Sequence, residues 1–335
     1  MKELVFCIFC FIGLVNNGFS VVSGDSSVRR FKNHISLAAH ITRIDLNANL
    51  SSAGNRNRIE YKTETAARLG MSFDYRWLAF ELFARLPFDK SSNKGKTQNS
   101  GIYGRINKSR FWANVIYQNF SGFYWSNPDQ TTRNGIKDGS FPLRPDIKNN
   151  LLQVNAFYIF KPDRFSNPAS QGENERQKKS GGSFFAGLGF YANNISGDSS
   201  LAPQSIDPQF DNIRNVRRIR SWLGSLNGGY AYCFVLKKKW YATVYAAPGL
   251  ARFTAISFSE DQNRDVVKGQ WTLRLESRIS VGYNSDKYFG GVLLSSFFNN
   301  QDLDTGIAYS YSFQTFRVFF GKRFALSKQL GFLGL

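Results

Sequence analysis

The sequence predicts an all-β fold: one transmembrane up-and-down barrel of about twelve antiparallel strands, a single domain that follows a signal peptide. Three observations predict it. Apolar and polar residues alternate along most of the chain, short and long connections alternate between these segments, and aromatic residues gather beside the short connections. Successive side chains of a strand point to opposite faces, so this alternation gives one face for lipid and one for the barrel interior.

The clearest segment is 271–283. Its odd positions are apolar apart from Ser277, whereas its even positions include Arg274, Glu276 and Arg278. Thirteen residues at about 3.3 Å each span about 40 Å, and a tilt of about 40° reduces this to about 30 Å, the thickness of a hydrocarbon core. Strands of soluble sandwiches also alternate but usually have about 5–6 residues. The length of the segment therefore favours a membrane strand.

The N-terminus has the pattern of a secretory signal peptide. Lys2 precedes an apolar run over residues 4–15, and small residues follow at 20–24. We expect residues 1–23 to be removed, which leaves residues 24–335 as the barrel domain. A membrane anchor is the alternative, but the run is shorter than the ~18 residues that a spanning helix needs. Cys233 is then the one remaining cysteine, so we expect no internal disulfide and no cysteine metal cluster.

The net charge of +19 would suggest nucleic acid for a cytosolic protein. Because a signal peptide is predicted and no nucleic-acid motif accompanies the basic residues, we expect no nucleic-acid partner. Outer-membrane lipids, lipopolysaccharide and anionic solutes or glycans suit the charge better. The sequence has no Gly-rich phosphate loop, zinc signature or nucleophile elbow, and we predict no cofactor and no metal.

Alternating segments continue to the C-terminus. We predict strands at 35–46, 59–75, 78–87, 99–107, 110–122, 151–161, 182–193, 219–236, 239–256, 268–283, 288–299 and 306–324. In the last strand the apolar residues change from odd positions (Tyr309, Tyr311) to even ones (Phe316, Val318). This change of phase predicts a β-bulge near Thr315.

The connections alternate in length, as in bacterial outer-membrane barrels with short periplasmic turns and long outer loops. Short connections are predicted near 76, 107–109, 237–239 and 284–287, and long ones at 47–58, 88–98, 123–150, 194–218 and 257–267. Tyr75 and Trp77, and Phe234 and Trp240, flank short turns, which is typical of a membrane interface. One connection, 162–181, is long and polar although it falls in a periplasmic position.

Four stretches of the chain look like segments of one protein family and occur in the same order as in that family. They are 69–78, 117–124, 143–147 and the exceptional connection 162–181. The chain resembles an uncharacterised outer-membrane barrel family of the Bacteroidota, catalogued as a domain of unknown function. The resemblance covers most of the mature chain and implies a barrel in the outer membrane of a Gram-negative bacterium, placed there by the barrel-assembly machinery. It implies no activity. Barrel assembly usually recognises an aromatic residue at the end of the last strand. In this chain the tail 325–335 follows that aromatic end.

Charged residues on the polar faces of the predicted strands form the candidate interior site. They are Glu81, Arg85, Arg274, Glu276, Arg278 and Arg317, with Arg323 near the end of the last strand. One interpretation is a polar path that selects anionic or sugar-like solutes. The other is an ion-pair network that fills the lumen and holds the strand register. A barrel of twelve strands is narrower than a porin of sixteen, which favours the network.

The polar connection is a second candidate. It carries Arg164, Glu173, Glu175, Arg176, Lys178 and Lys179. Such a segment either folds into the lumen as a plug, docks a periplasmic partner, or is a solvated loop, and we expect a structural or gating role. The loop 123–150, with Phe123, Tyr124 and Trp125, is predicted to be exposed, where it would stack on glycan or cap the barrel.

These patterns predict an outer-membrane channel or structural barrel with a charged, partly occluded lumen. A surface protein whose long outer loops bind glycan or another ligand is one alternative. A lipid-modifying enzyme is another, with His40 as its base near Ser36 or Thr42. A lone histidine on a strand is more often structural, so we expect no catalytic residue and no enzyme.

Overall fold

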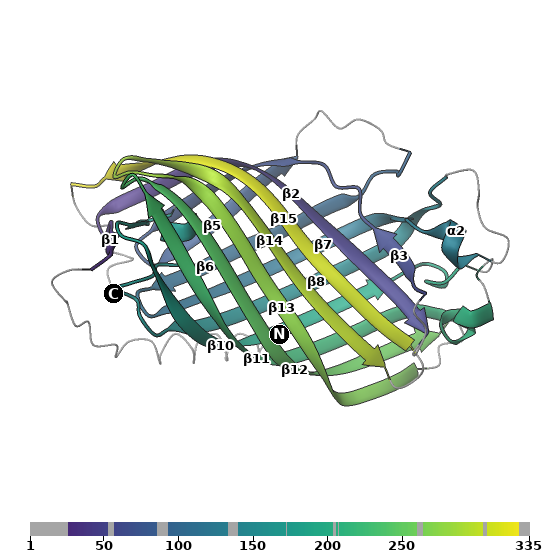
Figure 1. Ribbon diagram of the computed structural model, residues 1–335. Helices are drawn as coiled ribbons and strands as arrows, with labels where there is room; N and C mark the ends of the chain where they lie inside the picture. Colours follow the sequence, from purple (N-terminus) through teal and green to yellow (C-terminus); the bar gives the residue numbers. More distant parts are fainter. Residues whose placement is uncertain are drawn as a thin grey trace.

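The computed structural model describes residues 26–52, 57–85, 93–132, 140–171, 173–203, 206, 208–259, 264–303 and 307–327. The expected signal peptide and the end of the tail lie outside these residues. Twelve strands form a closed antiparallel ring (Figure 1): β2 (His34–Ser52), β4 (Arg68–Tyr75), β5 (Leu78–Arg85), β6 (Gln98–Lys108), β7 (Phe111–Trp125), β8 (Leu143–Ile159), β10 (Gly181–Ser196), β11 (Val216–Leu236), β12 (Trp240–Ser259), β13 (Arg264–Asn284), β14 (Tyr288–Leu303) and β15 (Ile307–Ala325). Ring neighbours follow one another along the chain, and β15 closes onto β2. The predicted barrel is confirmed.

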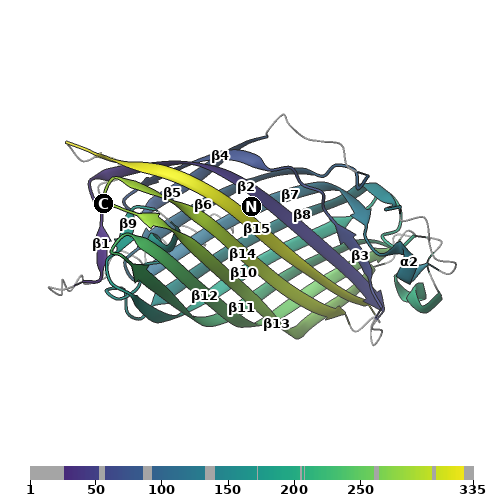
Figure 2. The ribbon, with the colours of Figure 1, turned by 45° about the horizontal axis from the view of Figure 1, so that its top comes forward.

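Short elements complete the structure: β1 (Val28–Arg30), β3 (Ile59–Lys62), β9 (Glu175–Gln177), α2 (Pro128–Thr131) and the 3-10 turns η2 (Ala169–Gln171) and η3 (Pro208–Ile213). Among the described residues no helix is long and apolar enough to cross a membrane. Strands β1 and β9 pair with each other as a separate small sheet. Figure 2 shows these two strands together at one end of the barrel.

The two ends of the barrel differ in their connections. At the end on the left of Figure 1, here the turn end, tight hairpins join β4 to β5, β6 to β7, β11 to β12 and β13 to β14. Arg76, Lys237 and Lys238 have positive φ angles of 54°, 46° and 64° in these turns. The opposite end, here the loop end, carries α2 (Figure 1) and the β10–β11 connection with η3. Strands β2, β7 and β8 extend further toward the loop end than predicted, into the expected connections 47–58 and 123–150.

The ring changes size along its axis. The predicted strand 59–75 is two strands, because β3 pairs with the loop-end half of β2 and β4 with its turn-end half. At the loop end β3 also pairs directly with β7, through Tyr61 and Trp125, so β5 and β6 take part only in the turn half. The described strands therefore make a ring of twelve in the turn half and of ten at the loop end. Since barrel diameter grows with strand number, the barrel narrows toward its loop end.

The faces of the wall exchange character halfway along. In the turn half the outward side chains are apolar and exposed, among them Leu82, Leu188, Leu226, Leu273, Val318 and Phe320, and we call this ring the apolar band. In the loop half β2 and β15 turn Asn47, Asn49, Ser310, Ser312 and Gln314 outward and Leu46, Leu50, Tyr309, Tyr311 and Phe313 inward. The outer surface is thus built for lipid in one half and for water in the other.

This exchange explains the change of phase in the last strand. The prediction of a bulge near Thr315 is wrong, because β15 pairs with both β14 and β2 in unbroken register through Thr315. Apolar residues move from odd to even positions there because the apolar environment moves from the inside of the barrel to the outside.

A hydrophobic core fills the loop half of the barrel. Wall residues such as Leu46, Phe120 and Phe253 are at most 1% exposed in it. The connection between β10 and β11 folds inward and adds Leu201, Ala202, Ile206, Phe210 and Ile213 to the same core. The predicted exposure of Phe123, Tyr124 and Trp125 is wrong: these residues end β7, and they are 3%, 6% and 2% exposed. The loop end is therefore closed by packed side chains.

Candidate functional site

The polar connection between β8 and β10, residues 161–180, folds back into the turn end of the barrel, and we call it the plug. Phe165 is 1% exposed, Ser170 0% and Glu173 4%. Phe165 packs in an apolar cluster with Trp112 and Phe185 of the wall. The rest of the plug interface is mainly polar, with hydrogen bonds and ion pairs to β6, β13 and β15.

Arg105 of β6 is the main ionic contact between wall and plug. Its Nη2 lies 2.5 Å from a carboxylate oxygen of Glu173, and its Nη1 donates a hydrogen bond of 2.7 Å to Gln171. Asn107, two residues further along β6, donates to the other carboxylate oxygen of Glu173 at 2.9 Å. One arginine and one amide of the wall thus fix both oxygens of a buried carboxylate.

Strand β13 binds the other side of the plug. Arg278 donates a hydrogen bond to the side chain of Asn167, and Ser280 Oγ donates to the carbonyl oxygen of Ser170 at 2.6 Å. Asn284, at the end of β13, donates to the carbonyl oxygen of Glu175 at 3.1 Å. Because Ser280 and Asn284 donate to backbone oxygens of the plug, they fix its path, whereas Arg278 holds one side chain.

Arg323 of β15 completes the attachment. Its guanidinium donates to the carbonyl oxygens of Glu173, at 3.1 Å from Nε, and of Ser285, at 2.6 Å from Nη1. The same group lies over the ring of Phe31, 4.5 Å from its centroid. A single buried cation therefore links the last strand, a wall turn, the plug and the N-terminal segment.

The plug also holds the N-terminal segment by charge. Arg30 lies 3.2 Å from Glu175, and Ser166 Oγ donates to the same carboxylate at 2.6 Å. Burial raises the pKa of Glu175, against the opposing effects of Arg30 and Ser166. Burial also raises the pKa of Glu173, against the effect of Arg105. The neighbouring cations thus offset only part of the desolvation cost of these two carboxyls.

The remaining charged residues predicted for the plug lie nearer the solvent. Arg176 pairs with Asp286 of the β13–β14 turn at 2.6 Å, and Arg29 of β1 pairs with the same aspartate at 2.9 Å. Arg164, Lys178 and Lys179 are exposed.

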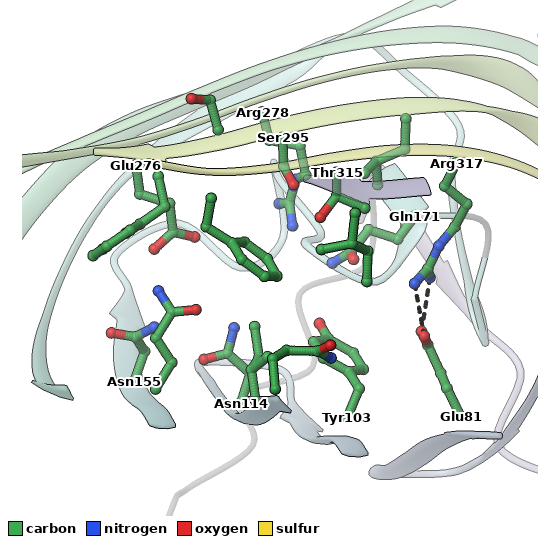
Figure 3. Close-up of a pocket in the computed structure, with 18 of the residues that line it drawn as sticks. Glu81, Tyr103, Asn114, Asn155, Gln171, Glu276, Arg278, Ser295, Thr315 and Arg317 are labelled. Carbon is green, nitrogen blue, oxygen red and sulfur yellow. Dashed lines mark hydrogen bonds and ion pairs between the residues drawn. The ribbon is translucent and has the colours of Figure 1, made fainter. Parts of the chain in front are cut away.

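A charged pair spans the interior above the plug (Figure 3). Glu81 of β5 accepts two hydrogen bonds from Arg317 of β15, at 2.7 and 2.6 Å. Arg317 Nε also donates to Thr42 of β2 at 3.2 Å, and Arg105 lies 3.9 Å from Glu81. Because Glu81 is 4% exposed, this carboxylate is enclosed with its cations. Arg85, the other predicted charge of β5, belongs to the strand, but its side chain lies outside the described residues.

The predicted trio on β13 divides into two groups. The guanidinium carbon of Arg274 lies 4.1 and 4.7 Å from the ring centroids of Tyr191 and Phe297, which stack on each other, and Arg274 Nη2 lies 3.6 Å from Glu276. Arg278 instead points toward the plug and lies 4.8 Å from the ring centroid of Tyr245. The three residues face the interior, but they do not form one continuous network.

A small chamber of about 90 Å³ separates the plug from the loop-half core (Figure 3). This is well above the ~10–15 Å³ that one water needs, so the chamber has room for several waters. Gln171 of the plug bounds it on one side, and Phe297 and Phe313 of the core on another. Asn114 Oδ1 and Gln118 Oε1 are buried along it without a hydrogen-bond partner among the described residues. The chamber therefore suits water or a small polar solute.

Sequence reasoning missed several interior charges. Arg68, Asp74 and Arg105 are 6%, 4% and 4% exposed. A signal for Arg105 was present, because Tyr103, Arg105 and Asn107 alternate with Ile102, Gly104 and Ile106. Arg68 and Asp74 also alternate with apolar residues of β4, but Gly70 and Ser72 between them carry no charge.

His40, the candidate catalytic residue, faces the interior and is 2% exposed. Its Nδ1 lies 3.0 Å from Thr42 Oγ1, and its ring meets Phe83 edge to face at 5.2 Å between centroids. The imidazole occupies the space that Gly70 leaves open, since a Cβ there would overlap it. Ser36 is bound instead to Asn174 of the plug, at 3.4 Å. In the described part of the chain no group of three His, Cys, Asp or Glu residues is placed to hold a metal ion.

Comparison with known proteins returns weak structural likenesses. The outer-membrane protease OmpT of Escherichia coli has a TM-score of 0.42 at 8% identity, over 89% of this chain and 98% of that one. The toluene transporter TodX of P. putida has a TM-score of 0.27 at 10% identity, over 88% and 90%. Ail, the attachment invasion locus protein of Yersinia pestis, has 0.25 at 8%, over 88% and 99%.

The family comparison is more informative. No curated protein matches the chain. A family model described as "Domain of unknown function (DUF4421)" matches residues 25–324. This match includes every strand of the ring except the last residue of β15. The chain belongs to the DUF4421 family.

Proposed function

We propose that this protein is an outer-membrane barrel whose charged interior is closed at rest by the plug, and that it passes small anionic or sugar-like solutes when the plug withdraws. The observation that carries the proposal is the nature of the plug interface. Ion pairs and hydrogen bonds from Arg105, Arg278 and Arg323 hold it, with Phe165 as an apolar anchor. Water can replace polar contacts of this kind at low net free-energy cost, so the plug is better suited to release than a packed core would be.

The apolar band supports a membrane location. Its outward residues would be unfavourable in water, whereas the closed ring satisfies the backbone hydrogen bonds that lipid cannot. The aromatic residues Tyr230, Phe234 and Trp240 border the band at the turn end, and Trp222 and Trp271 lie near its other edge. A Bacteroidota source and insertion by the barrel-assembly machinery follow from the sequence resemblance and belong to this proposal.

The interior charges support anionic solutes. Buried or half-buried cations of the described interior include Arg68, Arg105, Arg274, Arg278, Arg317 and Arg323, against the acids Asp74, Glu81, Glu173 and Glu276. Cations in excess favour anions in a narrow lumen. Passage also requires the hydrophobic core of the loop half to open, because its wall residues and the inward-folded Leu201, Ile206 and Phe210 close the loop end.

Neither alternative function gains support from the site. Phe123, Tyr124 and Trp125 are buried, so they offer no stacking surface for glycan. His40 points away from the lipid-facing surface. A structural barrel without transport remains the competing interpretation, and electrical recording separates the two.

We expect the purified mature chain to be nearly silent in planar bilayers, with rare openings selective for anions. Glu173→Gln should make openings about tenfold more frequent, because Arg105 loses the anion that attaches the plug. Lys178→Gln, in the exposed part of the plug, is the matched control and should behave as wild type. If Glu173→Gln is as silent as wild type at all voltages, the barrel is structural.

The orientation of the barrel can be tested with inserted tags. With long loops outside and short turns in the periplasm, a protease tag at Ser199 should be cleaved on intact cells. A tag at Lys238, in the tight β11–β12 turn, should be cleaved only after the outer membrane is opened. Cleavage at Lys238 on intact cells would reverse the proposed orientation.

A further inference from the structure

The outer surface of β11, β12 and β13 carries a cluster of cations and indoles at the loop-end edge of the apolar band. We call Arg218, Arg220, Trp222, Arg252 and Trp271 the Arg–Trp patch. Alternation along the strands turns them all outward. Register brings them together, because Arg252 of β12 stands directly between Gly224 of β11 and Trp271 of β13.

The guanidinium groups of the patch lie over aromatic rings. The guanidinium carbon of Arg252 lies 5.9 Å from the ring centroid of Trp271, and that of Arg220 lies 5.5 Å from the centroid of Phe258. Arg220 Nε also donates to Asn194 at 3.3 Å. A guanidinium above a ring keeps a restricted orientation while N–H groups at its edge stay available to an anion.

The described part of the wall does not neutralise the charges of Arg218 and Arg220. Within the described residues no carboxylate forms an ion pair with Arg218 or Arg220. Elsewhere on the outer surface, Arg43 of β2 is paired with Asp45 at 2.9 Å. Arg218 and Arg220 therefore differ from Arg43, whose charge Asp45 neutralises.

An open apolar surface continues from the patch into the band. A Cβ placed on Gly224 would meet no atom within 4 Å, so a niche opens beside Arg252. Toward the turn end, Leu226, Leu250 and Leu273 stand side by side on β11, β12 and β13, 65%, 47% and 72% exposed. The cations thus lie above a surface that suits acyl chains.

We propose that the Arg–Trp patch binds the phosphorylated head group of a lipid in the outer leaflet, such as the diphosphorylated disaccharide of lipid A. Arginine forms bidentate hydrogen bonds with phosphate, and the leucine row accepts the acyl chains of the same molecule. A free phosphate ion would use the cations but not the leucines. This inference rests on the proposed outer-membrane location and adds a specific lipid site to it.

The test compares Arg220→Gln/Arg252→Gln with the matched control Arg43→Gln, each as the full mature chain folded into phosphatidylcholine vesicles with 5% lipid A. After mild detergent extraction, native mass spectrometry measures retained lipid A. We expect the patch variant to bind it about 25-fold more weakly than wild type, since each of the two basic groups removed contributes about a factor of five near an anionic lipid surface. The control should bind as wild type does.

Two further arms identify the ligand. Dephosphorylated lipid A should bind wild type and patch variant equally weakly, and 10 mM inorganic phosphate should displace little lipid A. Full displacement would mean a site for free phosphate, and equal retention by wild type and patch variant would overturn the site. Folding into the vesicles is scored separately by the heat-modifiable gel shift. If wild type does not fold there, both the membrane proposal and this one fail; if it folds but shows no patch-dependent binding, only this one fails.

Discussion

Replacing Glu81 by glutamine should destabilise the barrel by about 3–5 kcal/mol, the usual cost of removing one partner from a buried ion pair. Glu81 is 4% exposed and accepts two hydrogen bonds from Arg317, with Arg105 3.9 Å away. The glutamine keeps the shape of the side chain, but it leaves both cations desolvated without that anion. The loss is measured as a lower urea midpoint of the protein folded in lipid vesicles, and as a lower melting temperature of the heat-modifiable form on gels.

Glu60→Gln is the matched control for this change. Glu60 lies at the loop end and pairs with Arg58 at 2.8 Å and with Lys62 at 3.1 Å. The Arg58 and Lys62 side chains are 56% and 38% exposed, and surface pairs of this kind contribute about 0–1 kcal/mol. Equal small losses for Glu60→Gln and Glu81→Gln would show that water screens the interior and that the lumen is open.

Arginine at Val318 should destabilise the barrel by about 2–4 kcal/mol, the cost of a basic side chain on the lipid face near the middle of the bilayer. Val318 points outward from β15 between Phe316 and Phe320, and the three are 43%, 45% and 64% exposed. Folding yield in vesicles and the urea midpoint measure the effect.

The control lies four residues away on the same face of the same strand. Gln314 also points outward, but it falls in the loop half, where the outer surface is polar. Gln314→Arg should change stability by about 0–1 kcal/mol, as basic residues do near the bilayer interface. If both substitutions are tolerated equally, the apolar band does not face lipid.

In the turn half, alternation separated the residues that face the interior from those that face outward. Along 271–283 it separated Arg274, Glu276 and Arg278 from the outward Leu273 and Leu275, and the structure has this arrangement. A period of two reports the face of a side chain, but it does not report which strand lies opposite. The partner of Glu81 is 236 residues away, and this contact depends on closure of the ring.

The plug was harder to interpret because its composition fits two environments. Glu173 and Glu175 look the same in sequence whether water or buried arginines surround them. The chain between β8 and β10 enters the barrel because Arg105, Arg278 and Arg323 offer it partners there, and these residues come from three distant strands. The change of phase near Thr315 was ambiguous for a similar reason, since a bulge and a change of environment shift apolar residues in the same way.

The exchange of faces near Thr315 places one continuous set of strands in two solvents. In the loop half, apolar side chains are buried away from water, so folding there releases ordered water and carries the large heat-capacity change of a globular protein. With the proposed membrane location, the outward apolar residues of the turn half pass from water into lipid when the barrel inserts, and the closed ring satisfies the backbone hydrogen bonds that lipid cannot. Strands such as β2 and β15, which run through both halves, therefore couple burial in a protein core to insertion into lipid.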